Sequence, residues 1–353
     1  MLGLSEFSTV HADGSSNQDR FGKAQIGFRA DKGDAVSSFT LQGDAYDGEY
    51  TPVAGLGRPR LSGMNLLGRW TRQLGEGSSF QVQAYFDHTE RDSVSTYRDR
   101  TDLADIEFQH AFELTAKQKL LWGGGYRYAR DSTVTHFDAP NPLPEAFLPN
   151  RRSLDWSNLF VQDEIALDPK LTLTLGMKVE TNIYTNAEYL PSARLAWKPS
   201  DNSLLWGAWS RAVRAPARLD VDFNLYLSLP KTALIPVIKG GPNFQSEVAY
   251  VTEIGYRAQP LQALSYSVTG FYSQYDRLRS GSPPPAFIQN LMGGPVYGVE
   301  AWGTWHAARD WRMSAGLVEL RERIRLLPGS KRSDRSQRAG ERSQTPVPGS
   351  FLA

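Results

Sequence analysis

The chain has 353 residues, no Cys and almost balanced charge, with 39 Lys and Arg against 38 Asp and Glu. The lack of Cys excludes disulfides, thiolate metal sites and cysteine nucleophiles, and a net charge of +1 provides no global basic field for nucleic acid. No run of 18 apolar residues is present, so no transmembrane helix is predicted. An all-β membrane protein remains possible despite the mean hydropathy of −0.43, because only half of each strand in such a protein faces lipid.

The first 18 residues show no periodic pattern, and we expect residues 1–18 to form a disordered or truncated lead. We expect no signal peptide in this segment, because it has no basic residue before Arg20 and no apolar core. From residue 19 onward, apolar and polar residues alternate in long segments, as they do in a strand with two different faces. This alternation predicts fourteen strands, at 19–30, 35–47, 61–73, 79–90, 101–114, 119–131, 153–167, 171–185, 191–198, 203–214, 247–259, 263–279, 296–307 and 311–325.

The strand from Leu171 shows the pattern most clearly. Its apolar positions are Leu171, Leu173, Leu175, Met177 and Val179. Its polar positions are Thr172, Thr174, Gly176, Lys178 and Glu180. Strands in soluble proteins are typically about 5 or 6 residues long, whereas a tilted strand that crosses a bilayer needs roughly 9 to 11. We therefore expect Leu173 and its apolar neighbours to face lipid, and Thr174 and Lys178 to face a lumen.

The connections between these strands alternate in length. Short turns are expected at 32–34, 75–77, near 116, 168–170, 200–202, 260–262 and 308–310, and longer loops at 48–60, 91–100, 132–152, near 186, 215–246 and 280–295. Alternate connections of an up-and-down meander lie at the same end of the sheet. The sequence therefore predicts an antiparallel up-and-down transmembrane β-barrel with short turns on one rim and long loops on the other.

Several motifs of the second half resemble those of TonB-dependent outer-membrane receptors. They are WSRAVRAPARLD at 209–220, SEVAYVTEIGYR at 246–257, and QN at 289–290 followed by VYGVE at 296–300. The resemblance is close over 152–305 and looser over 19–151. It implies energy-coupled uptake of a scarce solute, such as a ferric siderophore, through the outer membrane of a Gram-negative cell. The implied partners are outer-membrane lipid, a small iron chelate, and the TonB energy-coupling protein acting through a plug region.

The sequence also departs from that family. Receptors of this type have 22 strands and a plugged lumen, but only fourteen strands are counted and no plug domain precedes residue 19. Residues 328–353 lose the alternation and are expected to be disordered or translated out of frame. We therefore expect residues 19–327 to be a partial barrel. A passive 14-stranded pore and a non-functional receptor remnant remain as alternatives.

No catalytic, cofactor or metal site is predicted, and the chain is not expected to be an enzyme, because its five His lack paired ligand spacing. The Gly run 123–125 lies within a strand and is expected to ease curvature or close packing. Candidate contacts to a ligand or plug are Arg211, Arg214, Glu253, Arg257, Glu300, Tyr97, Arg98, Phe137, Arg151, Arg152, Tyr226, Lys231, Lys239 and Phe287. The alternatives are that Arg211 and Arg214 form lumen-wall ion pairs with Glu253 or anchor the backbone, and that the loop residues are solvated surface.

Overall fold

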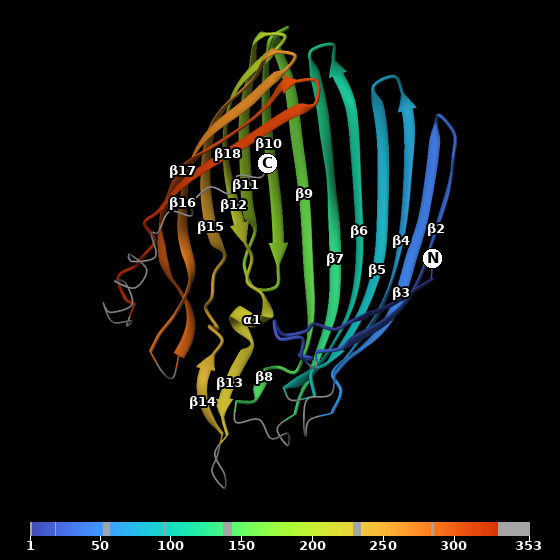
Figure 1. The fold of residues 1–353 in the computed structure, drawn as a ribbon, viewed down its shortest axis with the longest axis vertical. Helices are drawn as coiled ribbons and strands as arrows, with labels where there is room; N and C mark the ends of the chain where they lie inside the picture. Colours follow the sequence, from blue (N-terminus) through green and yellow to red (C-terminus); the bar gives the residue numbers. More distant parts are fainter. Residues whose placement is uncertain are drawn as a thin grey trace.

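The computed structural model describes residues 2–17, 19–51, 57–94, 96–136, 143–228, 234–283 and 286–330. Long antiparallel strands form one continuous curved wall (Figure 1). The fourteen predicted strands are all present. They are β2 (Phe21–Gly33), β3 (Ser37–Tyr50), β4 (Arg60–Gly75), β5 (Ser78–Asp92), β6 (Tyr97–Thr115), β7 (Gln118–Thr135), β9 (Arg151–Asp168), β10 (Leu171–Asn182), β11 (Glu188–Ser200), β12 (Ser203–Arg214), β15 (Glu247–Leu261), β16 (Leu264–Gly281), β17 (Ala286–Ala308) and β18 (Trp311–Glu322).

Six short elements were not predicted. They are β1 (Leu2–Phe7), β8 (Glu145–Phe147), α1 (Arg218–Val221), β13 (Phe223–Leu227), β14 (Ile235–Lys239) and β19 (Arg325–Leu326). β1 pairs with the start of β2 and lies in the segment that was expected to be a lead outside the barrel. The described residues contain no helix with the length and apolar character that a membrane crossing requires.

Each long strand pairs antiparallel with the next long strand along the chain, so the predicted meander is confirmed. Tight turns join the strands at one rim and the longer connections lie at the other (Figure 1). The turn after β2 illustrates the local chemistry. One carboxylate oxygen of Asp34 accepts hydrogen bonds from the backbone N–H groups of Val36 and Ser37, each at 2.8 Å. These donors, Ser37 first, lower the pKa of Asp34 and close the turn.

The long loops predicted at 91–100 and 280–295 are both wrong in their extent. β5 continues to Asp92 and β6 begins at Tyr97. β16 continues to Gly281 and β17 begins at Ala286, with Ser280 opposite Gln289. The sequence does not show the extension of β16 and β17 clearly, because their pairing register shifts twice between Tyr275 and Ser280. Such irregularities break the strict alternation of apolar and polar residues. The two strands therefore form a hairpin that reaches beyond the apolar part of the wall.

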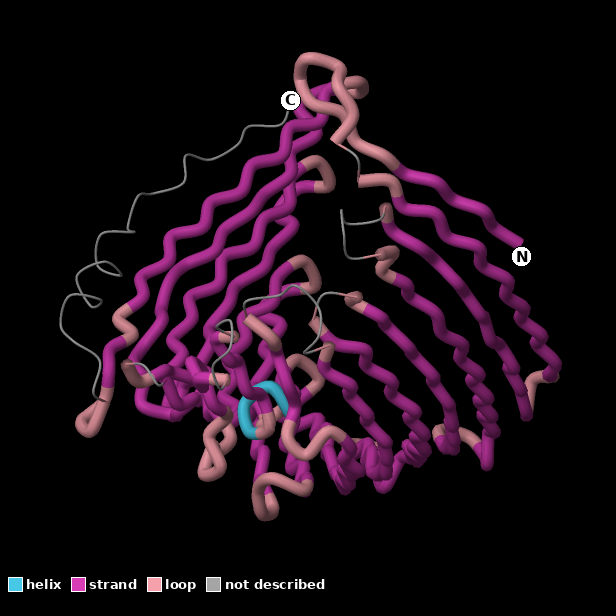
Figure 2. The backbone as a smooth tube through the Cα atoms, turned by 90° about the horizontal axis from the view of Figure 1, so that it is seen from below, coloured by secondary structure: helices cyan, strands magenta, loops and turns pink. Residues whose placement is uncertain are grey.

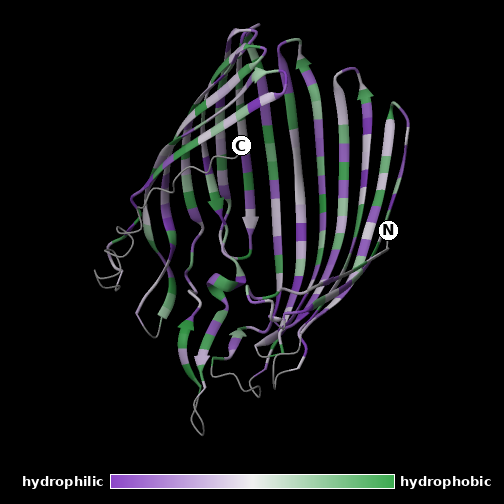
Figure 3. Cartoon of the chain, in the orientation of Figure 1, coloured by the Kyte–Doolittle hydropathy of each residue, from purple (hydrophilic) through white to green (hydrophobic). Residues whose placement is uncertain are grey.

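The two faces of the wall differ as the alternation predicts, and hydrophilic and hydrophobic residues alternate along the strands (Figure 3). On β10, Leu175 and Met177 are 44% and 40% exposed on the outer face. On the inner face, Lys178 pairs with Glu180 at 2.9 Å. An exposed apolar face suits contact with lipid, where apolar side chains are at no disadvantage.

His110, the one polar residue among the outward positions of β6 from 104 to 114, lies in an aromatic belt near the short-turn rim. Its Nδ1 accepts a hydrogen bond from the indole N–H of Trp122 at 3.2 Å, and its Nε2 lies 3.1 Å from the Ser78 hydroxyl. Its ring stacks on Phe112 with a centroid distance of 4.8 Å. Both ring nitrogens are therefore satisfied, which lets a polar residue occupy the outer face.

The wall is curved but open (Figure 2). Within the described residues, β18 has β17 as its only neighbour and β1 has only β2. The predicted gap between the first and last strands is thus present. No fourteen-stranded closed ring forms among the described residues.

Candidate functional site

The long-loop rim carries a small folded cap, which we define as β8, α1, β13 and β14 (Figure 1). β13 pairs antiparallel with both β8 and β14. β14 pairs parallel with the start of β17, where Lys239 lies opposite Phe287. Backbone hydrogen bonds thus join segments from three separate loops into one unit at this rim.

The core of the cap is charged. Arg218, Asp220 and Asp222 are only 7%, 0% and 2% exposed, whereas the apolar Leu219 between them is 43% exposed. The one-turn helix α1 places Arg218 and Asp222 four residues apart on the same side, where their charged groups meet at 3.0 Å. α1 therefore buries its polar side against the wall, the reverse of an ordinary amphipathic helix.

Asp220 collects donors from three directions. It accepts hydrogen bonds from Arg214 at 2.9 Å, from Arg279 at 3.3 Å and from the backbone N–H of Ala217 at 2.9 Å. Arg214 also donates to Glu247 at 2.7 Å. This half of the network ties α1 to β12, β15 and β16.

Asp222 ties the cap to the other side of the wall. It accepts hydrogen bonds from Arg152 at 2.5 Å, from Arg218 at 3.0 Å and from the Tyr184 hydroxyl at 3.3 Å. Arg218 donates in addition to Asp131 of β7 and to the backbone carbonyl of Pro149. Burial, and next the negative charge of Asp222, raise the pKa of Tyr184, so this phenol stays neutral and remains a donor.

The network fixes the position of the cap. Charges are buried only where partners compensate their lost hydration, and removing one partner of a buried pair costs about 3–5 kcal/mol. Asp220 and Asp222 each have two arginine donors. Arg152, Arg214, Arg218 and Arg279 are therefore occupied by internal carboxylates.

An aromatic seam runs beside the charges. The ring of Tyr97 packs edge-on against Phe147 of β8 at 5.7 Å, and Phe147 packs against Phe223 of β13 at 5.5 Å. The Arg218 guanidinium lies 5.2 Å from the Phe147 ring. Tyr97, a predicted contact to a ligand or plug, thus supports the cap from the wall.

The structure brings together six of the fourteen predicted site residues at the cap. Arg152 and Arg214 belong to the buried network, and Tyr97 belongs to the aromatic seam. The remaining three, Tyr226, Lys239 and Phe287, lie on the neighbouring strands β13, β14 and β17. Two other predicted residues, Phe137 and Lys231, lie outside the described residues.

Four predicted residues lie in the wall. Arg211 donates to Glu188 at 2.9 Å and to the backbone carbonyl of Tyr189 at 2.6 Å. The predicted ion pair of Arg211 or Arg214 with Glu253 is therefore wrong, because carboxylates closer to the arginines at the rim bind both of them. The predicted anchoring to the backbone is correct for Arg211. Among the described residues, no ion pair involves Glu253, Arg257 or Glu300.

The last two predicted residues, Arg98 and Arg151, lie on the outer face of the wall. Both lie on long strands, β6 and β9, at positions that alternate with inward-facing residues. Arg98 pairs with Asp92 at 2.5 Å. These residues face outward, away from the cap, because inward neighbours such as Leu154 are buried beneath it.

The sequence analysis missed the centre of the network. Asp220 ends the family-like segment 209–220, but Arg218, Asp222 and Asp131 were not singled out. The only local signal is the run Arg-Leu-Asp-Val-Asp at 218–222, which resembles an ordinary solvated loop. Its burial depends on strands more than 80 residues away, as the contact between Arg218 and Asp131 shows.

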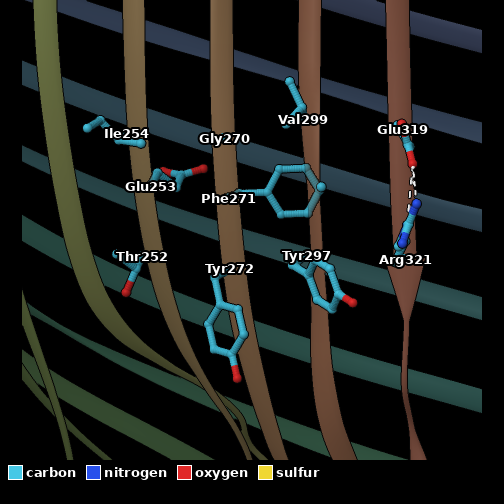
Figure 4. A pocket seen from close by; sticks show the side chains of 11 residues that line it. Thr252, Glu253, Ile254, Gly270, Phe271, Tyr272, Tyr297, Val299, Glu319 and Arg321 are labelled. Atoms are coloured by element: carbon cyan, nitrogen blue, oxygen red, sulfur yellow. Dashed lines mark hydrogen bonds and ion pairs between the residues drawn. The ribbon is translucent and has the colours of Figure 1, made fainter.

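A separate groove of about 460 Å³ lies across β15, β16, β17 and β18 (Figure 4). Its outward residues include Ile254, Tyr272 and Val299, which are 62%, 48% and 46% exposed. Glu319 and Arg321 pair along β18 at 3.0 Å and form one side of the groove. The groove is part of the outer face of the wall and is remote from the cap.

An up-and-down antiparallel wall with an apolar outer face, tight turns on one rim and folded loops on the other defines the class of outer-membrane β-barrels. The family model for the TonB dependent receptor-like beta-barrel matches residues 7–345. The chain therefore belongs to this family, which is an outer-membrane family of transporters and not of enzymes.

Solved structures agree with this assignment at the level of the fold. The FrpB iron transporter from Neisseria meningitidis is 14% identical, with a TM-score of 0.67 over 93% of this chain and 57% of that one. The siderophore receptor PirA from Pseudomonas aeruginosa is 15% identical, with a TM-score of 0.64 over 90% and 65%. The copper transporter OprC is 13% identical, with a TM-score of 0.65 over 90% and 55%. The chain thus spans less than two thirds of the length of these structures. A search of curated protein sequences gives no match.

Proposed function

We propose that the chain forms the wall and loop cap of an outer-membrane receptor that captures a small metal chelate, such as a ferric siderophore. Uptake of the chelate would be driven by the TonB energy-coupling protein through a plug region. Family membership and neighbours described as iron transporter, siderophore receptor and copper transporter support this proposal. The main observation behind this proposal is the cap itself. Hydrogen bonds fix its loops to several strands of the wall, so the rim presents a preorganised surface to a ligand.

Within the cap, the buried arginines are not the expected ligand contacts. Arg152, Arg214 and Arg218 already have carboxylate partners. A chelate that engaged them would have to break buried ion pairs. Lys239 of β14 and Phe287 of β17 lie opposite each other beside this network, and they form an aromatic and cationic combination that suits a flat anionic chelate.

The test is a titration of the refolded chain in detergent with ferric hydroxamate and ferric catecholate chelates, followed by tryptophan fluorescence. The chain contains nine Trp. We expect saturable quenching by one chelate class, and at least fivefold weaker binding in the double variant Lys239→Ala, Phe287→Ala. The control is Lys198→Ala, an exposed lysine at the opposite rim. Equal affinity in the double variant and the control would refute this location.

A further inference from the structure

The outer face of the wall carries a hollow of about 460 Å³ just below the long-loop rim. Its lining is formed by Arg100, Asp102, Arg130, Asp131, Ser132, Arg151, Arg152 and Ser153 of β6, β7 and β9. Two of these residues, Asp131 and Arg152, also bind Arg218 and Asp222 of the buried network. Nothing in the proposed uptake function uses it.

Alternation shows that three arginines of this hollow project outward. Arg130 has the same parity on β7 as Trp122 and Tyr126, which are 40% and 49% exposed. Its inward neighbour Ala129 is 2% exposed beneath the cap. Arg100 and Arg151 occupy the corresponding outward positions on β6 and β9, in line with the exposed Ile106 and Leu159. Asp131 and Arg152 point to the cap, where they bind Arg218 and Asp222.

Strand register brings the three outward arginines together. Ser132 lies opposite Arg100 on one side and Arg151 on the other. Arg130 is the next outward residue along β7, about 7 Å further. Neighbouring strands are about 4.8 Å apart, so long guanidinium side chains from these positions can converge on one small group.

The cluster is short of negative charge. Arg100 has one carboxylate partner, Asp102 at 3.6 Å, and Asp102 also binds His88 at 2.6 Å. Arg130 donates to the Tyr128 hydroxyl at 3.1 Å. Among the described residues, neither Arg130 nor Arg151 forms an ion pair.

The neighbouring charges do not neutralise the cluster. Glu90 lies opposite Arg100 but faces Arg98 at 3.8 Å, and Asp155 lies opposite Tyr128, one outward position nearer the apolar band. Elsewhere in the same belt, arginines are matched, as Arg60 is with Asp47 at 2.8 Å. On its outward positions, the hollow thus carries three arginines against one carboxylate, Asp102.

The cluster lies at the depth of lipid headgroups. On β7, the outward residues run from the apolar Trp122 through Tyr126 and Tyr128 to Arg130. Aromatic residues mark the interface of such barrels, and the headgroup region adds only about 5–7 Å to each side of the hydrocarbon core. A guanidinium at this level faces phosphate groups, to which it binds with paired hydrogen bonds.

We propose that Arg100, Arg130 and Arg151 form a site for the phosphate group of a lipid headgroup in the outer leaflet. The phosphate occupies the hollow, and the acyl chains of the same lipid lie on the exposed apolar residues below it, such as Ile106 and Leu159. The adjoining apolar surface favours a lipid over free phosphate, since only a lipid contacts both regions.

The test uses the refolded full chain in detergent micelles and native mass spectrometry with diphosphorylated lipid A as the probe. We expect bound lipid on the unmodified chain and at least tenfold weaker binding in the double variant Arg130→Gln, Arg151→Gln. The matched control is Arg60→Gln, which removes an exposed outward arginine that already has a carboxylate partner. The variant Arg130→Lys, Arg151→Lys should recover part of the binding, because it keeps the charge but not the paired hydrogen bonds.

Two further arms separate the sources of phosphate. Dephosphorylated lipid A should bind the unmodified chain weakly. Its affinity should equal that of diphosphorylated lipid A for the double Gln variant. Inorganic phosphate at millimolar concentration should not displace the lipid. Unchanged lipid binding in the double Gln variant, equal binding of the dephosphorylated lipid, or displacement by inorganic phosphate would each overturn the proposal. Circular dichroism of each variant checks that the β-structure is retained.

Discussion

Single residues of this protein differ in role according to what covers them. Arg151 and Arg152 are adjacent in sequence, but Arg152 binds the buried Asp222 and Arg151 faces outward. Asp222 and Asp155 are both acidic and close to the same rim, yet only Asp222 is buried. Burial determines the energetic importance of each charge, because an exposed ion pair contributes about 0–1 kcal/mol and a buried one is costly to break.

The first prediction concerns Asp222. Asp222→Asn removes the charge that compensates the buried Arg218, so we expect a loss of about 3 kcal/mol in the stability of the cap against local opening. Hydrogen exchange of the amides in α1 and β13 measures this loss. The control Asp31→Asn breaks an exposed pair with Arg29 and should change exchange little. Unaltered protection of α1 in Asp222→Asn would show that the network does not hold the cap.

The second prediction concerns Gly123. A Cβ at this position would press against the backbone carbonyl of Phe108 and lie 2.8 Å from the Phe160 ring, so the predicted role in close packing is correct. We expect Gly123→Ala to cost about 1–3 kcal/mol through overpacking, measured by urea unfolding in detergent. Gly68→Ala, where nothing lies within 4 Å of the added Cβ, should cost nothing. Equal stability of the two variants would contradict the packing argument.

At the scale of the element, each long strand has two faces with different surroundings, an apolar outer face and a polar inner face. Leu173 of β10 lies between Ile165 and Leu195 on the outer face, and Thr174 lies between Glu164 and Arg194 on the inner face. The same alternation holds in β6, where His110 remains on the outer face because Ser78 and Trp122 satisfy its ring nitrogens.

The third prediction tests these faces. A lipid-facing Arg near the bilayer centre costs about 2–4 kcal/mol. Leu173→Arg should therefore lower the fraction of chain that folds into phosphatidylcholine vesicles far more than Thr174→Arg does. The heat-dependent shift in gel mobility measures the folded fraction. Similar folded fractions for the two variants would mean that the outer face of β10 does not contact lipid.

At the scale of the whole molecule, the wall is a sheet with two free edges. β1 and β18 each have one neighbouring strand among the described residues. Backbone N–H and C=O groups left unpaired in a bilayer cost several kcal/mol each. Closing this sheet on itself would require a different shear and a narrower lumen than its curvature shows.

The fourth prediction follows from these edges. We expect the refolded 353-residue chain to give no discrete, stable single-channel conductance in planar bilayers and no solute flux in liposomes. A protein-free vesicle preparation serves as the baseline for leakage. Stable conductance steps of one size would contradict the receptor proposal for this polypeptide and favour the passive fourteen-stranded pore.

The fourteen long strands and the separation of short turns from long loops could be predicted from the sequence. Strand periodicity is a local property, because successive side chains point to opposite faces wherever the strand lies. The apolar parity of Leu173, Leu175 and Met177 follows from the same local pattern. Family motifs such as the segment 209–220 then identified the class of protein.

The cap, the burial of Asp220 and Asp222, and the outward position of Arg98 and Arg151 were decided only by the tertiary structure. Each depends on residues far apart in the chain, such as Arg218 with Asp131 or Asp220 with Arg279. Loop sequences rich in charge look solvated when read alone, because the pairing that makes their burial possible involves other strands. The alternation of side chains determined the wall, and long-range compensation of charge determined the cap.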